Sequence, residues 1–306
     1  MSNFYGESFS AFLTECGIEP GSYWLGSPAS FHGLQNAVYQ LYQQVTPSEF
    51  GEMALKYAEE GEDGEDGEDE GNFDGYDHMI NMHGNVAIVS VSGPMVPKTS
   101  FITEFFGITS YEDIRNALAA VVNSKKAKAI VMNWDTPGGA VSGTKETSDL
   151  ITKIDTRFLP VYSSANSNML SAGMWLGSSA RDISANTMSS VGSIGVVAIH
   201  VEMSEAMKRS GITTTVFRAG ARKALGDPYS PLSKKASEEI QSDINYIHTQ
   251  FMNHVAEERN MSPSEITAVA DGRTFWGPEA KKIGLVDNIR TLEELVDTLN
   301  EVHAHA

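Results

Sequence analysis

The chain has 306 residues, 41% of them hydrophobic, which suffices for one large domain or for a core domain with an appendage. The formal net charge is −18, but eleven of the 40 acidic residues and no basic residue lie within residues 59–77. The negative charge therefore belongs mainly to one segment. Without clustered Lys and Arg, the composition argues against a nucleic-acid-binding surface.

Cys16 is the single cysteine and cannot form an internal disulfide, so we expect a reducing compartment. The N-terminal residues lack the basic region and the apolar run of a signal peptide. No stretch reaches the roughly 18 apolar residues that a transmembrane helix needs. We therefore expect a soluble, cytoplasmic protein without a membrane anchor.

Residues 1–58 form a first zone, in which apolar residues at helical spacing predict a helix near Phe31–Gln44. This zone is too short to bury much of a core by itself. Residues 59–77 repeat Gly-Glu-Asp, which predicts a flexible, disordered linker. Its role is either that of a spacer or that of a docking site for a basic surface.

Residues 78–306 form the main domain, in which short apolar runs alternate with helical patterns. The predicted strands cover Val86–Gly93, Ala127–Asn133, Pro160–Ser164, Asp182–Ala185, Ile194–Ile199 and Thr213–Phe217. The predicted helices cover Tyr111–Asn123, Gly143–Ile154, Ser171–Ser179, Met203–Ser210, Ser233–Arg259 and Leu292–Val302. Strands that alternate with helices predict an α/β fold with a largely parallel sheet.

The segment Asp135–Val141 reads Asp-Thr-Pro-Gly-Gly-Ala-Val and follows a predicted strand. Two glycines that open a helix after a strand leave backbone N–H groups that can point at an anion. The anion would be a phosphate or a developing oxyanion. A tight turn without any ligand explains the same pattern.

Ser171 begins a predicted helix and is flanked by small residues. A serine at this position can act as an exposed nucleophile, and the N–H group of Ala172 can assist an oxyanion. The surrounding residues do not form a Gly-x-Ser-x-Gly motif, and an N-cap serine would give the same pattern.

Lys223 lies in a glycine-flanked loop, and a lysine can act as a general base where desolvation lowers its pKa. Most loop lysines have no such role. Ser193 can orient a lysine amine or can simply occupy a turn. The histidines lack a metal or triad signature. A Ser–His–Asp triad stays open as an alternative, because its members need not be close in sequence.

Four segments in this order resemble the signal peptide peptidase A family of serine proteases, which includes capsid-maturation proteases of some tailed phages. They are Pro137-Gly138-Gly139, Ser171-Ala172-Gly173, Gly192-Ser193-Ile194-Gly195 and Lys223. The later stretch Ala270–Asp287 is similar to the C-terminal signature of that family. The resemblance runs from about Val86 to Leu299.

The resemblance implies a fold similar to Clp protease and crotonase: a β/α core with a parallel sheet and flanking helices, assembled into homo-oligomeric rings. It also implies that Ser171 is the nucleophile, Lys223 the general base and Ser193 the group that orients the lysine. In some members the serine and the lysine come from different subunits. The implied oxyanion donors are the N–H groups of Gly138, Gly139 and Ala172.

Within this resemblance, the acidic linker and the lack of an anchor favour a phage or prophage capsid-maturation protease. A membrane-independent peptidase for signal peptides or protein quality control is the alternative. The expected substrates are extended capsid, portal or scaffold proteins, and we expect no cofactor and no metal. The protein would lie in the cytoplasm of a bacterial host or be associated with the virion.

Two further alternatives come from other classes of protein. The same fold carries acyl-CoA chemistry, in which a Gly-Gly turn polarises a thioester carbonyl. A non-catalytic ring that organises a virion is the second. The presence of both Ser171 and Lys223 favours the protease over either.

Overall fold

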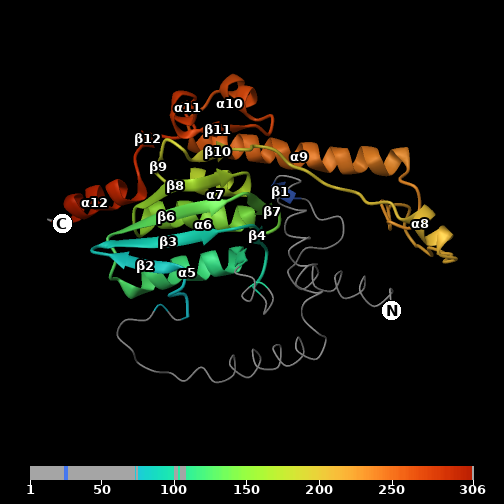
Figure 1. The fold of residues 1–306 in the computed structure, drawn as a ribbon, viewed down its shortest axis with the longest axis horizontal. Coiled ribbons are helices and arrows are strands. Elements are labelled where there is room, and N and C mark those ends of the chain that lie inside the picture. Colours follow the sequence, from blue (N-terminus) through green and yellow to red (C-terminus); the bar gives the residue numbers. More distant parts are fainter. Residues whose placement is uncertain (1–23, 27–72, 74, 100–102, 104–107, 305–306) are drawn as a thin grey trace.

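The computed structural model describes residues 24–26, 73, 75–99, 103 and 108–304, and Figure 1 shows a central sheet flanked by helices. The predicted helix near Phe31–Gln44 and most of the acidic stretch lie outside the described residues. Phe73, near the end of that stretch, is 7% exposed and belongs to the core, and the Tyr76 hydroxyl accepts a hydrogen bond from Asn116. Residues just before the expected domain boundary thus pack against the domain.

The larger sheet in the described part of the chain has eight strands, of which β3 (Val86–Ser92), β6 (Ala129–Thr136) and β8 (Val161–Leu170) form the centre. These three strands are parallel, with Val86 paired to Ala129 and Ile130 paired to Val161. Parallel strands have both faces covered, which explains their nearly continuous apolar sequences. The predicted α/β fold with a largely parallel sheet is confirmed.

The remaining strands extend this sheet on both sides. β9 (Asp182–Ala185) and β10 (Ser190–Gly192) run parallel to β8, and β12 (Asn288–Ile289) runs parallel to β9. The antiparallel strands are β2 (Ile80–His83), paired with β3, and β11 (Thr274–Trp276), paired with β10.

Alternating residues of the central strands enter two separate apolar clusters, as the period of two in a strand requires. In β6, Ile130 and Met132 join the large cluster, whereas Val131 joins a smaller one. The smaller cluster is completed by Leu295 and Leu299 of the C-terminal helix α12 (Leu292–His303). Helix α12 therefore covers the face of the sheet opposite to the large cluster.

The large cluster is covered by four helices and bordered by two short ones. The four are α5 (Tyr111–Ser124), α6 (Thr144–Arg157), α7 (Ala172–Ser178) and the long α9 (Lys234–Glu258), each close to its predicted range. The short ones are α10 (Pro263–Val269) and α11 (Gly277–Lys282). Helix α5 starts with a capping box. The hydroxyl of Ser110 accepts a hydrogen bond from the backbone N–H of Asp113, and the carboxylate of Asp113 accepts one from the backbone N–H of Ser110.

A second, four-stranded sheet has the order β1 (Trp24–Gly26), β7 (Gly138–Ala140), β4 (Met95–Val96) and β5 (Thr109–Ser110). The expectation that Gly138 and Gly139 open a helix is therefore wrong, because helix α6 starts only at Thr144. Strand β7 needs a glycine at its centre, since a Cβ on Gly139 would lie 2.3 Å from the carbonyl oxygen of Met95.

The segment between β10 and α9 extends away from the core, as Figure 1 shows for α8 (Ser204–Arg209). We call residues 195–235 the arm, and none of them is buried. The strands predicted over Ile194–Ile199 and Thr213–Phe217 do not form, because a strand needs a hydrogen-bonded neighbour along its length and these two segments have at most an isolated bridge at Val197. No helix in the described ranges is long and apolar enough to cross a membrane.

Candidate active site

Ser171 lies at the turn between β8 and α7 and has a strained backbone, with φ 54° and ψ −114°. A non-glycine residue in this region is rare and marks functional sites when the surrounding structure holds it there. The Ser171 N–H donates to the carbonyl of Gly192 at 2.8 Å, and the Ser171 carbonyl accepts from Trp175 N–H at 2.9 Å. The turn is thus fixed by backbone hydrogen bonds on both sides.

The hydroxyl of Ser171 has no hydrogen-bond partner among the described residues, although the residue is only 1% exposed. An N-cap serine would use its oxygen to accept from the first helical turn, and this one does not. A buried, unpaired hydroxyl costs stability, so its persistence calls for an explanation. The geometry fits a nucleophile held on a sharp strand-to-helix turn.

Helix α7 lies so close to the sheet that a side chain at either of two glycine positions would force a neighbouring side chain to shift. A Cβ on Gly173 would lie 2.5 Å from Thr136 Cγ2, and one on Gly177 would lie 2.4 Å from Met169 Sδ. Because Thr136 and Met169 are paired residues of β6 and β8, the nucleophile turn is seated directly on the central sheet.

Helix α9 supports α7 from the other side through two aromatic contacts. Trp175 stacks on Phe251 and on His254, with ring centroids 4.9 and 5.5 Å apart. His254 Nε2 lies 3.1 Å from the carbonyl oxygen of Trp175 and 3.2 Å from the hydroxyl of Ser179. Burial lowers the pKa of His254 to about 4, so the imidazole is neutral at pH 7. Sequence reasoning missed this support, because the contacts join distant segments.

Strand β7 brings the Pro-Gly-Gly turn beside the nucleophile helix, and α7 contacts β7. The N–H of Gly138 donates to Thr136 Oγ1 at 3.1 Å, and the carbonyl of Ala140 accepts from the hydroxyl of Tyr111 at 2.7 Å. Gly138, which was expected to be an oxyanion donor, therefore has its N–H already engaged. Because polar groups alternate along a strand, the N–H of Gly139 faces the opposite edge of β7.

Ser193 directly follows Gly192, which is paired with Leu170, the residue before Ser171. Ser193 also has a positive φ of 53°, and its N–H donates to the carbonyl of Arg273 at 2.8 Å. The structure thus places Ser193 next to the nucleophile turn, directly after the end of the neighbouring parallel strand β10.

Lys223 is exposed and lies in the arm, the segment that extends away from the core. Its neighbour Arg222 forms an ion pair with Glu239 near the start of α9, with a distance of 3.3 Å. His254, which contacts the nucleophile helix, lies 15 positions later on α9, or about 20 Å along a helix that rises 1.5 Å per residue. Ser171, Ser193 and the glycine turn are therefore brought together, whereas Lys223 is not.

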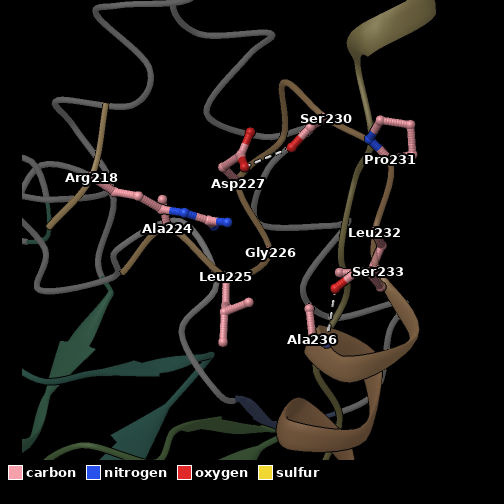
Figure 2. A pocket seen from close by; sticks show the side chains of 10 residues that line it. All are labelled: Arg218, Ala224, Leu225, Gly226, Asp227, Ser230, Pro231, Leu232, Ser233 and Ala236. Atoms are coloured by element: carbon pink, nitrogen blue, oxygen red, sulfur yellow. Dashed lines mark hydrogen bonds between the residues drawn. The ribbon is translucent and has the colours of Figure 1, made fainter. Parts of the chain in front are cut away.

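A pocket lies where the arm joins the start of α9, and Figure 2 shows its lining. Inside this lining, Asp227 accepts a hydrogen bond from the hydroxyl of Ser230 at 2.7 Å, and Ser233 caps α9 by accepting from Ala236 N–H at 3.1 Å. These hydrogen bonds fix the loop that follows Lys223, and the lining contains no residue from the region of Ser171. The described residues contain no cluster of His, Cys, Asp and Glu that could hold a metal.

Comparisons with known proteins show which proteins the chain is similar to. The family model described as "Peptidase family S49" matches residues 154–305, which contain Ser171, Ser193 and Lys223. The "Capsid assembly protease C" of Escherichia phage lambda is 27% identical over 71% of this chain and 49% of its own length. Residues 154–305 thus match peptidase family S49.

A second relative, the "Putative signal peptide peptidase SppA" of Enterococcus faecium, is 27% identical over 63% of this chain and 56% of its own length. The chain thus spans about half the length of these curated relatives. Among solved structures, a mutant of ClpP1 from Listeria monocytogenes has a TM-score of 0.42 and 17% identity. That similarity covers 68% of this chain and 94% of the other.

Proposed function

We propose that this chain is a serine endopeptidase of the S49 family with Ser171 as its nucleophile. The observation that carries the proposal is the strained backbone of Ser171 combined with a buried hydroxyl that has no partner among the described residues. A serine used only for structure would gain a hydrogen bond at this position, whereas a nucleophile must keep its hydroxyl available.

In the proposed reaction, Lys223 takes the proton of the Ser171 hydroxyl while the oxygen attacks the scissile carbonyl carbon. The N–H groups of Gly139 and Ala172 stabilise the resulting oxyanion, and Ser193 orients the lysine amine. The protonated lysine then gives its proton to the leaving amine as the C–N bond breaks. Water, activated by the same lysine, hydrolyses the ester on Ser171 and releases the acid.

We propose further that Lys223 comes from a neighbouring copy of this chain. What supports this is the path of α9: Glu239, which pairs with the neighbour of Lys223, and His254, which contacts the nucleophile helix, are about 20 Å apart along the helix, farther than a lysine side chain extends. The arm also exposes several large apolar side chains, which is typical of a protein–protein interface. They are Val201, Met203, Ile212, Val216, Phe217, Tyr229 and Leu232.

For the biological role, we propose processing of phage or prophage capsid proteins in an extended conformation. The similarity to a capsid assembly protease supports this role. Cleavage of a co-expressed capsid, portal or scaffold protein from the same phage or prophage genome by wild type but not by Ser171→Ala is the expected result. Cleavage only of signal peptides would favour the alternative peptidase role.

A fluorophosphonate probe, which reacts with activated serines, tests the nucleophile and the base. We expect labelling of wild type and none of Ser171→Ala or Lys223→Ala, with Lys208→Ala as a control because Lys208 is another exposed lysine of the arm. Equal labelling of all variants, or none in folded and assembled wild type, would rule out the Ser171–Lys223 mechanism and favour acyl-CoA chemistry or a structural ring.

Mixing two inactive variants tests whether the dyad forms between chains. In a random mixture of Ser171→Ala and Lys223→Ala subunits, about one quarter of head-to-tail interfaces combine an intact serine with an intact lysine. We therefore expect labelling to return to about one quarter of the wild-type level after the subunits exchange. If the dyad formed within one chain, the mixture would stay inactive.

A further inference from the structure

Strand β1 comes from far upstream in the chain and pairs antiparallel with the edge of β7. Its three residues pair in register, with Trp24 opposite Ala140, Leu25 opposite Gly139 and Gly26 opposite Gly138. β1 is the outermost strand of its sheet, so without it β7 would have a free edge. Addition of an extended peptide to a sheet edge is a common mode of peptide recognition.

The register places Leu25 of β1 opposite Gly139, whose N–H group the proposed reaction uses to bind the oxyanion. The carbonyl of Ala140 is bound by Tyr111 and Thr144, and the N–H of Gly138 by Thr136, so these residues direct their polar groups away from β1. Gly139 lies between them and faces β1, with Leu25 as its register partner. The backbone of Leu25 thus lies where a substrate carbonyl would meet the N–H of Gly139.

The direction of β1 and the burial of the site agree with this placement. Because β1 is antiparallel to β7, its Gly26 end lies at the Gly138 end of β7, next to the turn that follows Thr136. Thr136 is paired with Met169, two residues before Ser171. Ser171 and the whole of β7 are buried, so an extended peptide can reach them only after the segments that cover them have moved.

We propose that Trp24–Gly26 is an internal strand that occupies the peptide-binding edge of β7 and blocks Ser171 until β1 withdraws. This inference rests on the proposed peptidase function. A strand of three residues makes few ladder hydrogen bonds, so local opening can release it without unfolding the domain. The N-terminal segment would then act as a competitor of extended protein substrates.

The test compares Leu25→Pro with Leu25→Ala. Proline removes the N–H that faces β7 and so disrupts the pairing, whereas alanine keeps this N–H and serves as the matched control. Two properties are measured in the full chain: hydrogen–deuterium exchange of the peptide that covers residues 138–140, and the rate of Ser171 labelling by a fluorophosphonate. Circular dichroism checks that each variant is folded.

We expect Leu25→Pro to accelerate both the hydrogen exchange of β7 and the labelling of Ser171. The labelling rate should rise by roughly tenfold, because the loss of two ordinary backbone hydrogen bonds has about this effect on an opening equilibrium. Leu25→Ala should stay within about twofold of wild type, since it keeps the backbone bonds. A synthetic peptide of residues 20–30 should protect β7 again in the proline variant and slow its labelling, whereas the same peptide with Leu25→Pro should not.

Unchanged exchange of β7 in Leu25→Pro, or faster exchange with unchanged labelling, would overturn the blocking role and leave the proposed peptidase intact. Failure of the synthetic peptide to protect β7 or to slow labelling would also count against the blocking role. Absence of labelling in every variant, despite faster exchange of β7, would overturn the peptidase and with it the blocking role, while the strand pairing itself would stand.

Discussion

Ser171 and Ser193 occupy matching positions at the ends of two paired parallel strands, and both have positive φ angles, 54° and 53°. Their preceding residues, Leu170 and Gly192, are register partners, and Ser171 N–H donates to the carbonyl of Gly192. Two neighbouring strained serines at one edge of a sheet form an arrangement that packing alone does not require. This pair is the structural centre of the proposed active site.

The first prediction concerns Ser193, the proposed orienting group for Lys223. Ser193→Gly removes the hydroxyl, so we expect labelling of Ser171 to slow by about tenfold or more. Because glycine adopts a positive φ without strain, the free energy of unfolding should rise by up to about 1 kcal/mol. Ser193→Ala should lose labelling similarly without the gain in stability. Labelling rates and thermal unfolding measure the two effects. Wild-type labelling in both variants would show that Ser193 has only a structural role.

The second prediction concerns the close contact of β7 and β4. Gly139→Ala places a Cβ 2.3 Å from Met95 O and 2.7 Å from Met95 Cβ, so we expect a loss of about 1–3 kcal/mol in the free energy of unfolding. Gly195→Ala is the control, because its Cβ would lie 3.4 Å from Gly272 Cα, an ordinary contact. Urea denaturation compares the variants. Equal stability of both would mean that β7 moves away from β4 at little cost.

The third prediction is a pH dependence from His254. Burial holds its pKa at about 4 in the folded chain, against 6.5 for the ordinary side chain, with opposing contributions from Lys145 and Asp149 on α6. Below pH 6.5 the unfolded chain therefore binds a proton that the folded chain does not. The stability of the fold should fall as the pH decreases from 6.5 to 4, by a total on the order of 3 kcal/mol.

His254→Phe removes this titration while keeping a ring that can stack on Trp175. Denaturation at pH 7, 5.5 and 4 should show a smaller loss of stability in this variant than in wild type. Burial also raises the pKa of Glu258, but this residue is present in both chains and its effect cancels in the comparison. An identical pH profile of the two chains would contradict the assignment to His254.

The fourth prediction concerns assembly through the arm. Phe217 is 92% exposed, so Phe217→Asp should leave the free energy of unfolding of a single chain almost unchanged. If the arm contacts a neighbouring copy, this variant should reduce the assembled mass in native mass spectrometry and the labelling of Ser171 together. Phe158→Asp, at the end of α6 outside the arm, is the control. A normal mass with Phe217→Asp would exclude this part of the arm as an interface.

Local sequence patterns were sufficient for the core of the fold. The apolar runs of β3, β6 and β8 and the helical spacing in α5, α6 and α9 reflect burial that each segment shows by itself. The arm was the exception, since Thr213–Phe217 has a strand-like sequence but no neighbouring strand in the described part of this chain. A run of apolar residues that faces a protein–protein interface has the same local sequence pattern as one that is buried in a core.

For the site, the sequence predicted which residues lie near each other better than it predicted their conformation. Ser171, Ser193 and Gly139 were all candidates from the family resemblance, and the structure brings their segments together. The strand conformation of Gly138–Ala140 and its pairing with β1 depend on contacts between distant segments, which no local pattern contains. The same holds for the lowered pKa of His254, which depends on burial against α7.

The length of α9 has a consequence for the kinetics of the proposed enzyme. If the lysine of each proposed catalytic centre comes from a neighbouring copy, as the path of α9 favours, every complete centre requires an encounter of two chains. Activity should then follow the law of mass action: at low protein concentration the rate rises more steeply than in proportion to the amount of protein. Newly made chains would stay inert while dilute and would become active where they are concentrated, as inside a growing particle.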